Sequence, residues 1–280
     1  MNIQINDNFA KLNVLDSDNL ADVNHYSKLE AKDKVIADTG TTIFDFYSID
    51  DLKYAHEWPY PFTYVVNEHC FRFEEIPTET DLAVFGCSFT FGLGLPKEML
   101  WHDILAKELN LSCLNFGMCG ASIKSIVDVF CIVSKHIKIK KAIFLLPSIV
   151  RTQIAKTHPL IDRVDYLTAF PGHPSQLCNS YSINNEGYFK YFPEEELNKD
   201  AKESVYLSQF VAKHRGIDAY YGSWDPDTIK LLKAMQFTNG TLLPEWWTPV
   251  HLSDDKARDK MHPGPEHNKY WANEIKPFIK

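Results

Sequence analysis

Short apolar runs alternate with amphipathic segments through the middle of the chain. Three mostly apolar runs each stop at a glycine or a proline: residues 82–85 before Gly86, residues 113–116 before Gly117 and residues 142–146 before Pro147. Runs of this kind are typical of parallel strands buried on both faces. Residues 98–109 and 122–137 carry apolar side chains at helical spacing, with Ser122 placed as an N-cap. The alternation predicts an α/β protein with a parallel sheet covered by helices on both faces.

The flanking segments are less regular. Residues 63–66 and 71–73 are predicted as two short strands joined by a polar turn, and residues 1–40 as an extended arm or a short helix plus a loop. Residues 151–194 show little periodicity and are interpreted as an insertion over the sheet edge. Downstream we expect a helix from 193 to about 214, a strand at 217–221, a helix over 225–235 and a last helix within 263–279. We therefore divide the chain into an N-terminal extension, residues 1–75, packed on a main domain, residues 76–280.

Composition and charge limit the classes of partner. Of the 280 residues, 45% are hydrophobic and 24% are charged, which is ordinary globular composition. The net charge of −8 makes a broad basic surface for nucleic acid unexpected. Residues 1–80 hold 15 Asp and Glu against 6 Lys and Arg. This acidic segment is either a solvated face or a docking surface for a homo-oligomer or a larger assembly.

Cysteine spacing and the N-terminal residues bear on the compartment. The six cysteines form no Cys-x-x-Cys pair, and Cys113 and Cys131 lie in apolar runs. Free buried thiols of this kind favour a reducing compartment over a disulfide framework. The first residues lack the basic and apolar parts of a signal peptide, and no apolar run approaches the roughly 20 residues that span a bilayer. We expect a soluble, cytoplasmic protein that does not act at membranes.

The segment after the first apolar run, residues 86–92, carries a candidate nucleophile. In parallel sheets, reactive groups gather at the carboxyl ends of the strands. Ser88 lies there on a predicted tight strand-to-helix turn, which would project its hydroxyl into the cleft at this edge. Gly86 and Gly92 would let the backbone turn sharply and approach a substrate closely. Taken alone, such a segment is more often a packed loop of small residues.

Asp259 and His262 near the C-terminus form a candidate acid–base pair. A spacing of three residues places both side chains on one side of a turn. The carboxylate can then accept from one imidazole nitrogen, which leaves the other nitrogen to take a proton. The alternative is a surface loop before a helix. His262 and His267 are five apart without further ligands nearby in sequence, so neither a metal site nor a cofactor is expected.

Residues 115–122 begin at the end of the second run and contain a third candidate element. Its backbone N–H groups would point into the same cleft, and a glycine such as Gly120 allows an oxyanion to approach closely. The alternative is a glycine-rich turn that only connects a strand to a helix.

In this order, the three segments resemble the SGNH hydrolases, also called the GDSL lipase/esterase superfamily. Residues 86–92 resemble the family's nucleophile block, residues 115–122 its second block, and Asp259, His262 and Pro263 its Asp-x-x-His-Pro block. Residues 71–76 are similar to a strand that often precedes the nucleophile block in some members. The resemblance covers roughly residues 60–150 and 255–278, and it depends on the blocks occurring together.

The resemblance implies a flavodoxin-like three-layer α/β/α sandwich and hydrolysis of carboxylic esters without a metal. Ser88 would attack the acyl carbon, His262 would act as general base and then as general acid, and Asp259 would orient His262. The backbone N–H groups of Ser88 and Gly120 would bind the oxyanion.

Two departures from the family's pattern bear on activity. Cys87 replaces the usual Asp of the first block, which is not a proton carrier. The third block supplies an Asn side chain to the oxyanion hole, but residues 146–151 contain no Asn. Loss of one oxyanion donor costs on the order of 10²–10³ in rate. Asn115, Ser148 and Arg151 are the candidates to replace it.

The leading hypothesis is therefore a serine esterase acting through an acyl-serine on a small-molecule ester, with an O-acetyl group on a saccharide as one candidate. The alternative is a catalytically weak or inactive binding or structural module with the same fold, such as a carbohydrate-binding protein or a virion component. A third hypothesis is acyl transfer, which passes through the same acyl-serine.

Overall fold

A five-stranded, entirely parallel sheet lies at the centre of the computed structural model, in the order β10-β9-β5-β3-β4. The strands are β3 (Glu79–Gly86), β4 (Cys113–Gly117), β5 (Lys138–Leu146), β9 (Asp218–Ser223) and β10 (Thr241–Leu242). The structure describes residues 35–37, 63–65, 71–73, 76–157, 164–171, 182–183, 193–245, 252–258, 260 and 262–279.

The strand order reverses between β3 and β5. The chain passes from β3 to its neighbour β4, then crosses to β5 on the other side of β3 and continues outward through β9 to β10. This is the order of a flavodoxin-like doubly wound sheet, in which ligands bind at the carboxyl ends of the strands where the order reverses. The carboxyl ends of β3 and β5 are therefore the place to look for a site.

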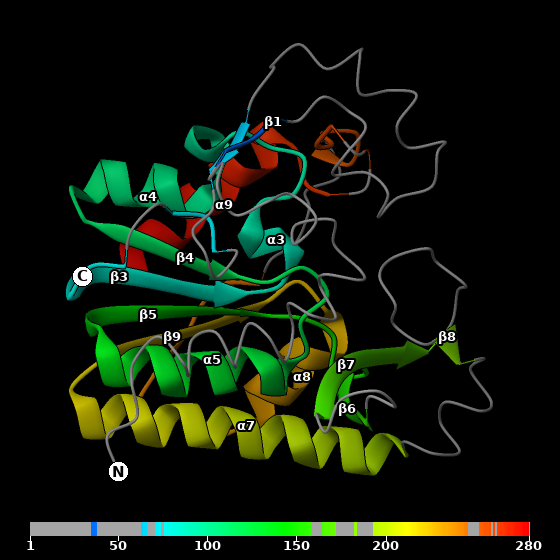
Figure 1. Ribbon diagram of the computed structural model, residues 1–280. Helices are drawn as coiled ribbons and strands as arrows, with labels where there is room; N and C mark the ends of the chain where they lie inside the picture. The colour runs from blue at the N-terminus through cyan, green and yellow to red at the C-terminus, as the bar shows by residue number, and fades with distance from the viewer. Residues whose placement is uncertain are drawn as a thin grey trace.

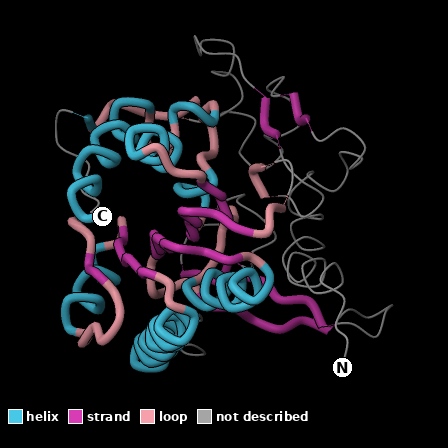
Figure 2. The backbone as a smooth tube through the Cα atoms, turned by 90° about the vertical axis from the view of Figure 1, so that its left-hand side faces the viewer, coloured by secondary structure: helices cyan, strands magenta, loops and turns pink. Residues whose placement is uncertain are grey.

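Helices cover both faces of the sheet (Figure 1, Figure 2). In Figure 1, α4 (Trp101–Leu109) and α9 (Pro265–Ile275) lie above the sheet, and α5 (Ile123–His136), α7 (Glu194–Arg215) and α8 (Pro226–Ala234) lie below it. Short 3₁₀ turns, η4 (Lys97–Met99) and η6 (Lys276–Phe278), precede α4 and follow α9. The predicted three-layer α/β/α fold is confirmed.

Alternation along the strands divides the core into two layers. In β3, Phe85 packs in the layer with α5 and α7, whereas Val84 packs in the layer with α4 and α9. The same alternation separates Phe144 from Ile143 in β5. Both faces of each strand are buried, which is why the strands read as continuous apolar runs rather than as alternating ones.

Outside the central sheet, the structure departs from the predicted elements. Residues 71–73 form no strand, so this prediction is wrong; β2 (Thr63–Val65) instead pairs antiparallel with β1 (Val35–Ala37). Phe71 and Phe73 pack their side chains on the sheet domain without forming a strand. A short apolar run in the sequence does not distinguish a buried strand from a buried segment of another conformation.

Strands also occur within residues 151–194, where periodicity gave no sign of them. β6 (Thr152–Thr157) and β7 (Val164–Pro171) are antiparallel, and β8 (Ser182–Ile183) runs parallel to β7. They form a separate three-stranded sheet. Over the described residues, no helix combines the length and the apolar character that crossing a membrane requires.

Candidate active site

Ser88 is the first residue of a four-residue helix, α3 (Ser88–Phe91), which starts directly after β3. Cys87 is the N-cap, and Gly92 ends the helix with a left-handed φ of 80°. The turn therefore places Ser88 at the carboxyl edge of the sheet, beside the point where the strand order reverses. This is the predicted strand-to-helix turn.

Two glycines at the strand ends let α3 lie directly against the sheet. Gly86 of β3 and Gly117 of β4 are register neighbours. A Cβ on Gly117 would lie 2.2 Å from the backbone nitrogen of Phe91, and a Cβ on Gly86 would overlap the Thr90 hydroxyl. Glycine is therefore needed at position 86 because α3 itself packs closely against the backbone there.

His262 reaches the same edge from a loop that precedes α9. The His262 carbonyl accepts from the Ala257 N–H at 2.9 Å, and the Gly264 N–H donates to the Asp255 carbonyl at 3.0 Å. The Asp255 carboxylate accepts from the His267 N–H in the first turn of α9, at 2.7 Å. These bonds close the loop and tie it to the helix.

The side chains of Ser88 and His262 meet. Ser88 Oγ lies 2.7 Å from His262 Nε2, and the residues are only 9% and 7% exposed. When Nε2 carries no proton, this contact is a hydrogen bond donated by the serine hydroxyl. The His262 and Phe89 rings meet in a T-shaped arrangement, 5.3 Å between centroids. A serine hydroxyl bound to an imidazole nitrogen in this way is the arrangement that nucleophilic catalysis requires.

Asp259, the predicted orienting carboxylate, lies outside the described residues, as does its neighbour Met261. Its role as the third member of a triad stays a prediction from the sequence. Gly120 lies in the turn between β4 and α5, with a left-handed φ of 76°. It therefore follows the carboxyl end of a strand adjacent to β3, as expected.

Asn115, one candidate oxyanion donor, uses its amide inside the fold. The side chain is buried, and Nδ2 donates to the Thr90 carbonyl at 2.9 Å while Oδ1 accepts from the Gly117 N–H at 2.8 Å. These bonds hold α3 to β4. Because the amide is used in this way, we leave Asn115 out of the proposed oxyanion hole.

Ser148 and Arg151, the other two candidates, lie in the loop after β5. The Thr228 hydroxyl fixes this loop by donating to the Pro147 carbonyl at 2.9 Å. The Arg151 guanidinium lies over the Trp224 ring, 5.3 Å from its centroid. Both candidates are half-buried beside the strand-order reversal.

Sequence reasoning missed Trp224, which directly follows β9. Its ring stacks on Phe89 at 4.9 Å, and its indole N–H donates to the Cys87 sulfur at 3.4 Å. Trp224 therefore supports both neighbours of Ser88. Its position at a strand's carboxyl end was the available signal, and the sequence analysis did not use it.

Behind α3, two titratable groups depart from their ordinary behaviour. Burial, and then the nearby Arg72 charge, lowers the pKa of His102 to about 3, so this imidazole stays neutral. Burial raises the pKa of Asp103 to about 6. His102 Nε2 lies 3.2 Å from the Thr90 carbonyl. His102 thus belongs to the support of α3.

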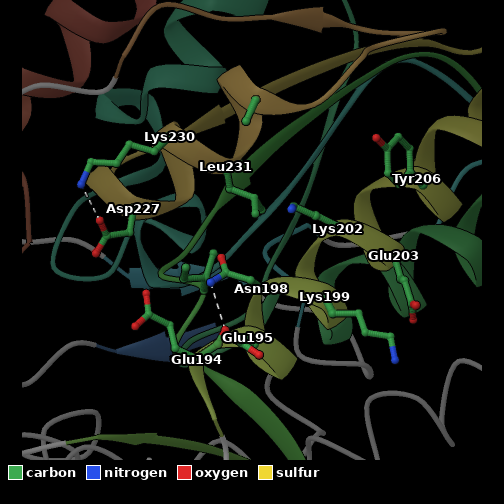
Figure 3. Close-up of a pocket in the computed structure, with 12 residues that line it drawn as sticks. Glu194, Glu195, Asn198, Lys199, Lys202, Glu203, Tyr206, Asp227, Lys230 and Leu231 are labelled. Atoms are coloured by element: carbon green, nitrogen blue, oxygen red, sulfur yellow. Dashed lines mark hydrogen bonds and ion pairs between the residues drawn. The ribbon is translucent and has the colours of Figure 1, made fainter.

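A groove of about 820 Å³ between α7 and α8 is separate from this pair (Figure 3). Its walls carry charged side chains such as Asp227 and Lys230, which form an ion pair at 2.8 Å. No serine, cysteine or histidine lines the groove, so it offers no nucleophile or imidazole base. Among the described residues, no cluster of three His, Cys, Asp or Glu side chains could hold a metal ion.

The fold and the site together define a three-layer α/β/α protein with a serine–histidine pair at the carboxyl edge of its sheet. No protein-family model matches the chain, and no curated protein matches it. Among solved structures, the chain is similar to psychrotrophic esterase EstA from Pseudoalteromonas sp., with 11% identity, 72% of this chain and 97% of that chain covered, and a TM-score of 0.44.

Two further structures are similar to the chain. They are TesA, with 13% identity, 71% and 98% coverage and a TM-score of 0.47, and a member of the lipolytic protein G-D-S-L family from Veillonella parvula, with 13% identity, 69% and 94% coverage and a TM-score of 0.40. At these TM-scores the likeness carries no conclusion about activity.

Proposed function

We propose that the protein is a serine ester hydrolase of the SGNH type. The observation that carries the proposal is the 2.7 Å contact between Ser88 Oγ and His262 Nε2. The two residues are 174 positions apart, and both come from segments whose sequence pattern resembles that family. A buried hydroxyl against an imidazole can lose its proton to the ring as it attacks a carbonyl carbon.

The reaction takes two steps. Ser88 Oγ attacks the ester carbonyl carbon while its proton passes to His262 Nε2, and the alcohol then leaves with that proton, giving an acyl-serine. A water molecule gives its proton to His262 and attacks the acyl carbon, and Ser88 regains the proton as the carboxylic acid departs. In this proposal, Asp259 orients His262.

The oxyanion would be bound by two backbone N–H groups, those of Ser88 and Gly120. The first N–H groups of a helix have no partner inside it, which leaves the Ser88 N–H suited to this role. With no Asn after β5, a third donor would have to be Ser148 or Arg151. If neither donates, we expect a rate lower by about 10²–10³ than a complete site would give.

We propose a small acyl ester as substrate, with an O-acetyl group on a saccharide as the candidate suggested by the family resemblance. Purified protein would be tested with p-nitrophenyl acetate and with O-acetylated oligosaccharides. Adding an alcohol acceptor and analysing the products would separate hydrolysis from acyl transfer.

The first test replaces Ser88 and His262 by alanine and measures covalent labelling by a fluorophosphonate, which assumes no substrate. Labelling should fall to background in Ser88→Ala, and hydrolysis should fall by about 10⁶-fold in either variant, the order measured when such residues are removed. Ser204→Ala is the matched control, because Ser204 is also 9% exposed and donates within α7 to the Asp200 carbonyl. It should behave as wild type.

The competing candidate is a binding or structural module that keeps the fold without the chemistry. The missing Asn after β5 is the observation that favours it. If wild-type protein takes up no fluorophosphonate and hydrolyses no ester, the hydrolase proposal is wrong and this candidate is favoured. If Ser88→Ala labels like wild type, Ser88 is not the nucleophile.

A further inference from the structure

α3 is too short to be stable by itself. An isolated helix needs about 12–15 residues before its hydrogen bonds offset the cost of nucleation, and α3 has four. The position of Ser88 at the start of α3 therefore depends on groups that hold the helix from outside. The carbonyl end of α3 shows what these groups are.

One side chain, Arg72, binds two carbonyls at that end and a third carbonyl in the loop just beyond it. Arg72 Nη1 donates to the carbonyls of Phe91 at 2.9 Å and Gly92 at 2.7 Å, and Nη2 donates to the Leu95 carbonyl at 2.5 Å. The guanidinium also lies over the Phe91 ring, 5.6 Å from its centroid. A permanent positive charge against the carbonyl end of a helix is favourable.

The backbone that carries Arg72 is anchored on the sheet. Phe71 and Phe73 each meet the Phe116 ring of β4 edge to face, at 4.9 and 5.2 Å between centroids. Phe116 in turn stacks on Phe85 of β3 at 5.2 Å. Arg72 itself is only 2% exposed. Through Phe71 and Phe73, the segment that carries the guanidinium is anchored on β4 and, by way of Phe116, on β3.

We propose that Arg72 is a positioning residue for Ser88, which it fixes against His262 by clamping the carbonyl end of α3. This inference rests on the proposed hydrolase function, and it adds a residue that touches neither substrate nor reacting atoms. A displacement of about 1 Å at a reacting group can cost on the order of 10²-fold in rate. Without these hydrogen bonds, α3 could shift and Ser88 Oγ could move away from His262 Nε2, which now lies 2.7 Å from it.

The test compares Arg72→Lys and Arg72→Gln with wild type in the full chain. Lysine keeps the charge, but an ammonium cannot present the planar fork that spans three carbonyls. We expect kcat and the rate of fluorophosphonate labelling to fall by about 10–100-fold in both variants, with KM for p-nitrophenyl acetate unchanged, because Arg72 does not contact substrate. Each rate is divided by the folded fraction measured by circular dichroism.

Arg215→Gln is the matched control. Arg215 also donates a guanidinium N–H to a backbone carbonyl, that of Ser134 at 2.7 Å, and it lies at the end of α7 away from Ser88. It should label at the wild-type rate. In Arg72→Ala, added methylguanidinium should restore part of the labelling, as a positioning role requires, and it should not affect Ser88→Ala.

Each outcome has one meaning. If the Arg72 variants lose rate only in proportion to their folded fraction, or label as fast as wild type, Arg72 is structural and the inference is wrong. If kcat falls at unchanged KM while the folded fraction is retained, the inference stands. If wild-type protein is neither labelled nor active on any ester, the proposed function has failed, and the positioning role is rejected with it.

Discussion

His262 owes its position to neighbours that hold it without sharing its chemistry. Its ring is braced by Phe89, and Phe89 is braced by Trp224. The main-chain bonds from the Ala257 N–H and to Asp255 fix the loop from the other side. Aromatic contacts of this kind contribute about 0.5–1.5 kcal/mol each beyond the area they bury. The imidazole is therefore oriented before any substrate arrives.

Asp103 gives a prediction about stability and pH. Because burial raises the pKa of this carboxyl to about 6, the folded state binds its proton more tightly than the unfolded state does. Asp103 therefore destabilises the fold increasingly as pH rises from about 4 through 6. Replacing it by Asn removes that cost, but it also removes a favourable negative charge from the first turn of α4, worth about 0.5 kcal/mol.

We expect Asp103→Asn to raise the free energy of unfolding at pH 7 by about 2–3 kcal/mol, the net of these two effects. The gain should shrink as pH falls and vanish by about pH 3, below the ordinary Asp pKa, where Asp103 is protonated in both states. Urea denaturation at both pH values measures it. Asp227→Asn, in the exposed first turn of α8, controls for the helix-end charge and should give no gain. A gain at pH 3 as large as at pH 7 would contradict the explanation.

The site depends on how α3 seats on the ends of β3 and β4. A Cβ on Gly117 would lie 2.2 Å from the Phe91 nitrogen, so α3 would have to move. Gly117→Ala should therefore lose fluorophosphonate labelling by at least about 10²-fold, the order expected from a 1 Å displacement. The variant should remain folded by circular dichroism, because the three atoms nearest to the added Cβ all belong to the short helix α3.

Gly216→Ala is the control at the scale of elements. Gly216 ends α7 with a φ of 65° and nothing lies within 4 Å of its would-be Cβ. The left-handed backbone should cost about 1 kcal/mol of stability, and labelling should keep its wild-type rate. Equal losses of labelling in the two variants would mean that α3 is sensitive to stability in general, not to its seat.

The elements of the central sheet could be predicted from the sequence because both faces of β3 and β5 are buried, which leaves long apolar runs. The contact between Ser88 and His262 could be anticipated because short sequence motifs mark both residues. The role of Arg72 could not, since its acceptors are backbone carbonyls, which leave no trace in the side-chain pattern. The same limit hid the non-strand conformation of residues 71–73 and the strand pairing within residues 151–194.

Asn115 shows how a side chain can be placed correctly along the chain and still be assigned the wrong partner. It lies in the middle of β4, and its amide donates to the Thr90 carbonyl of α3. Whether an amide on a strand faces the cleft or the neighbouring helix depends on packing that one sequence does not record.

At the scale of the whole molecule, the sheet joins two core layers. Phe144 lies in one layer, where its ring meets Phe85, Phe130 and Tyr221 at centroid distances of 5.3, 4.9 and 4.9 Å. The layer on the opposite face contains the fully buried tryptophans Trp101 and Trp271. Because the same strands carry both layers, a loss of packing on one face should weaken the other.

Phe144→Ala tests that coupling. Removing a fully buried phenylalanine should lower the free energy of unfolding by about 3–5 kcal/mol. Urea unfolding followed by tryptophan fluorescence, to which the opposite layer contributes Trp101 and Trp271, should shift by the same amount as unfolding followed by far-ultraviolet circular dichroism. Phe278→Ala is the control, because that ring is 39% exposed and its loss should change stability by no more than about 0.5 kcal/mol. If the two probes separate in Phe144→Ala, the layers unfold independently, and the support that reaches Ser88 from β3 and β4 would be confined to one side of the sheet.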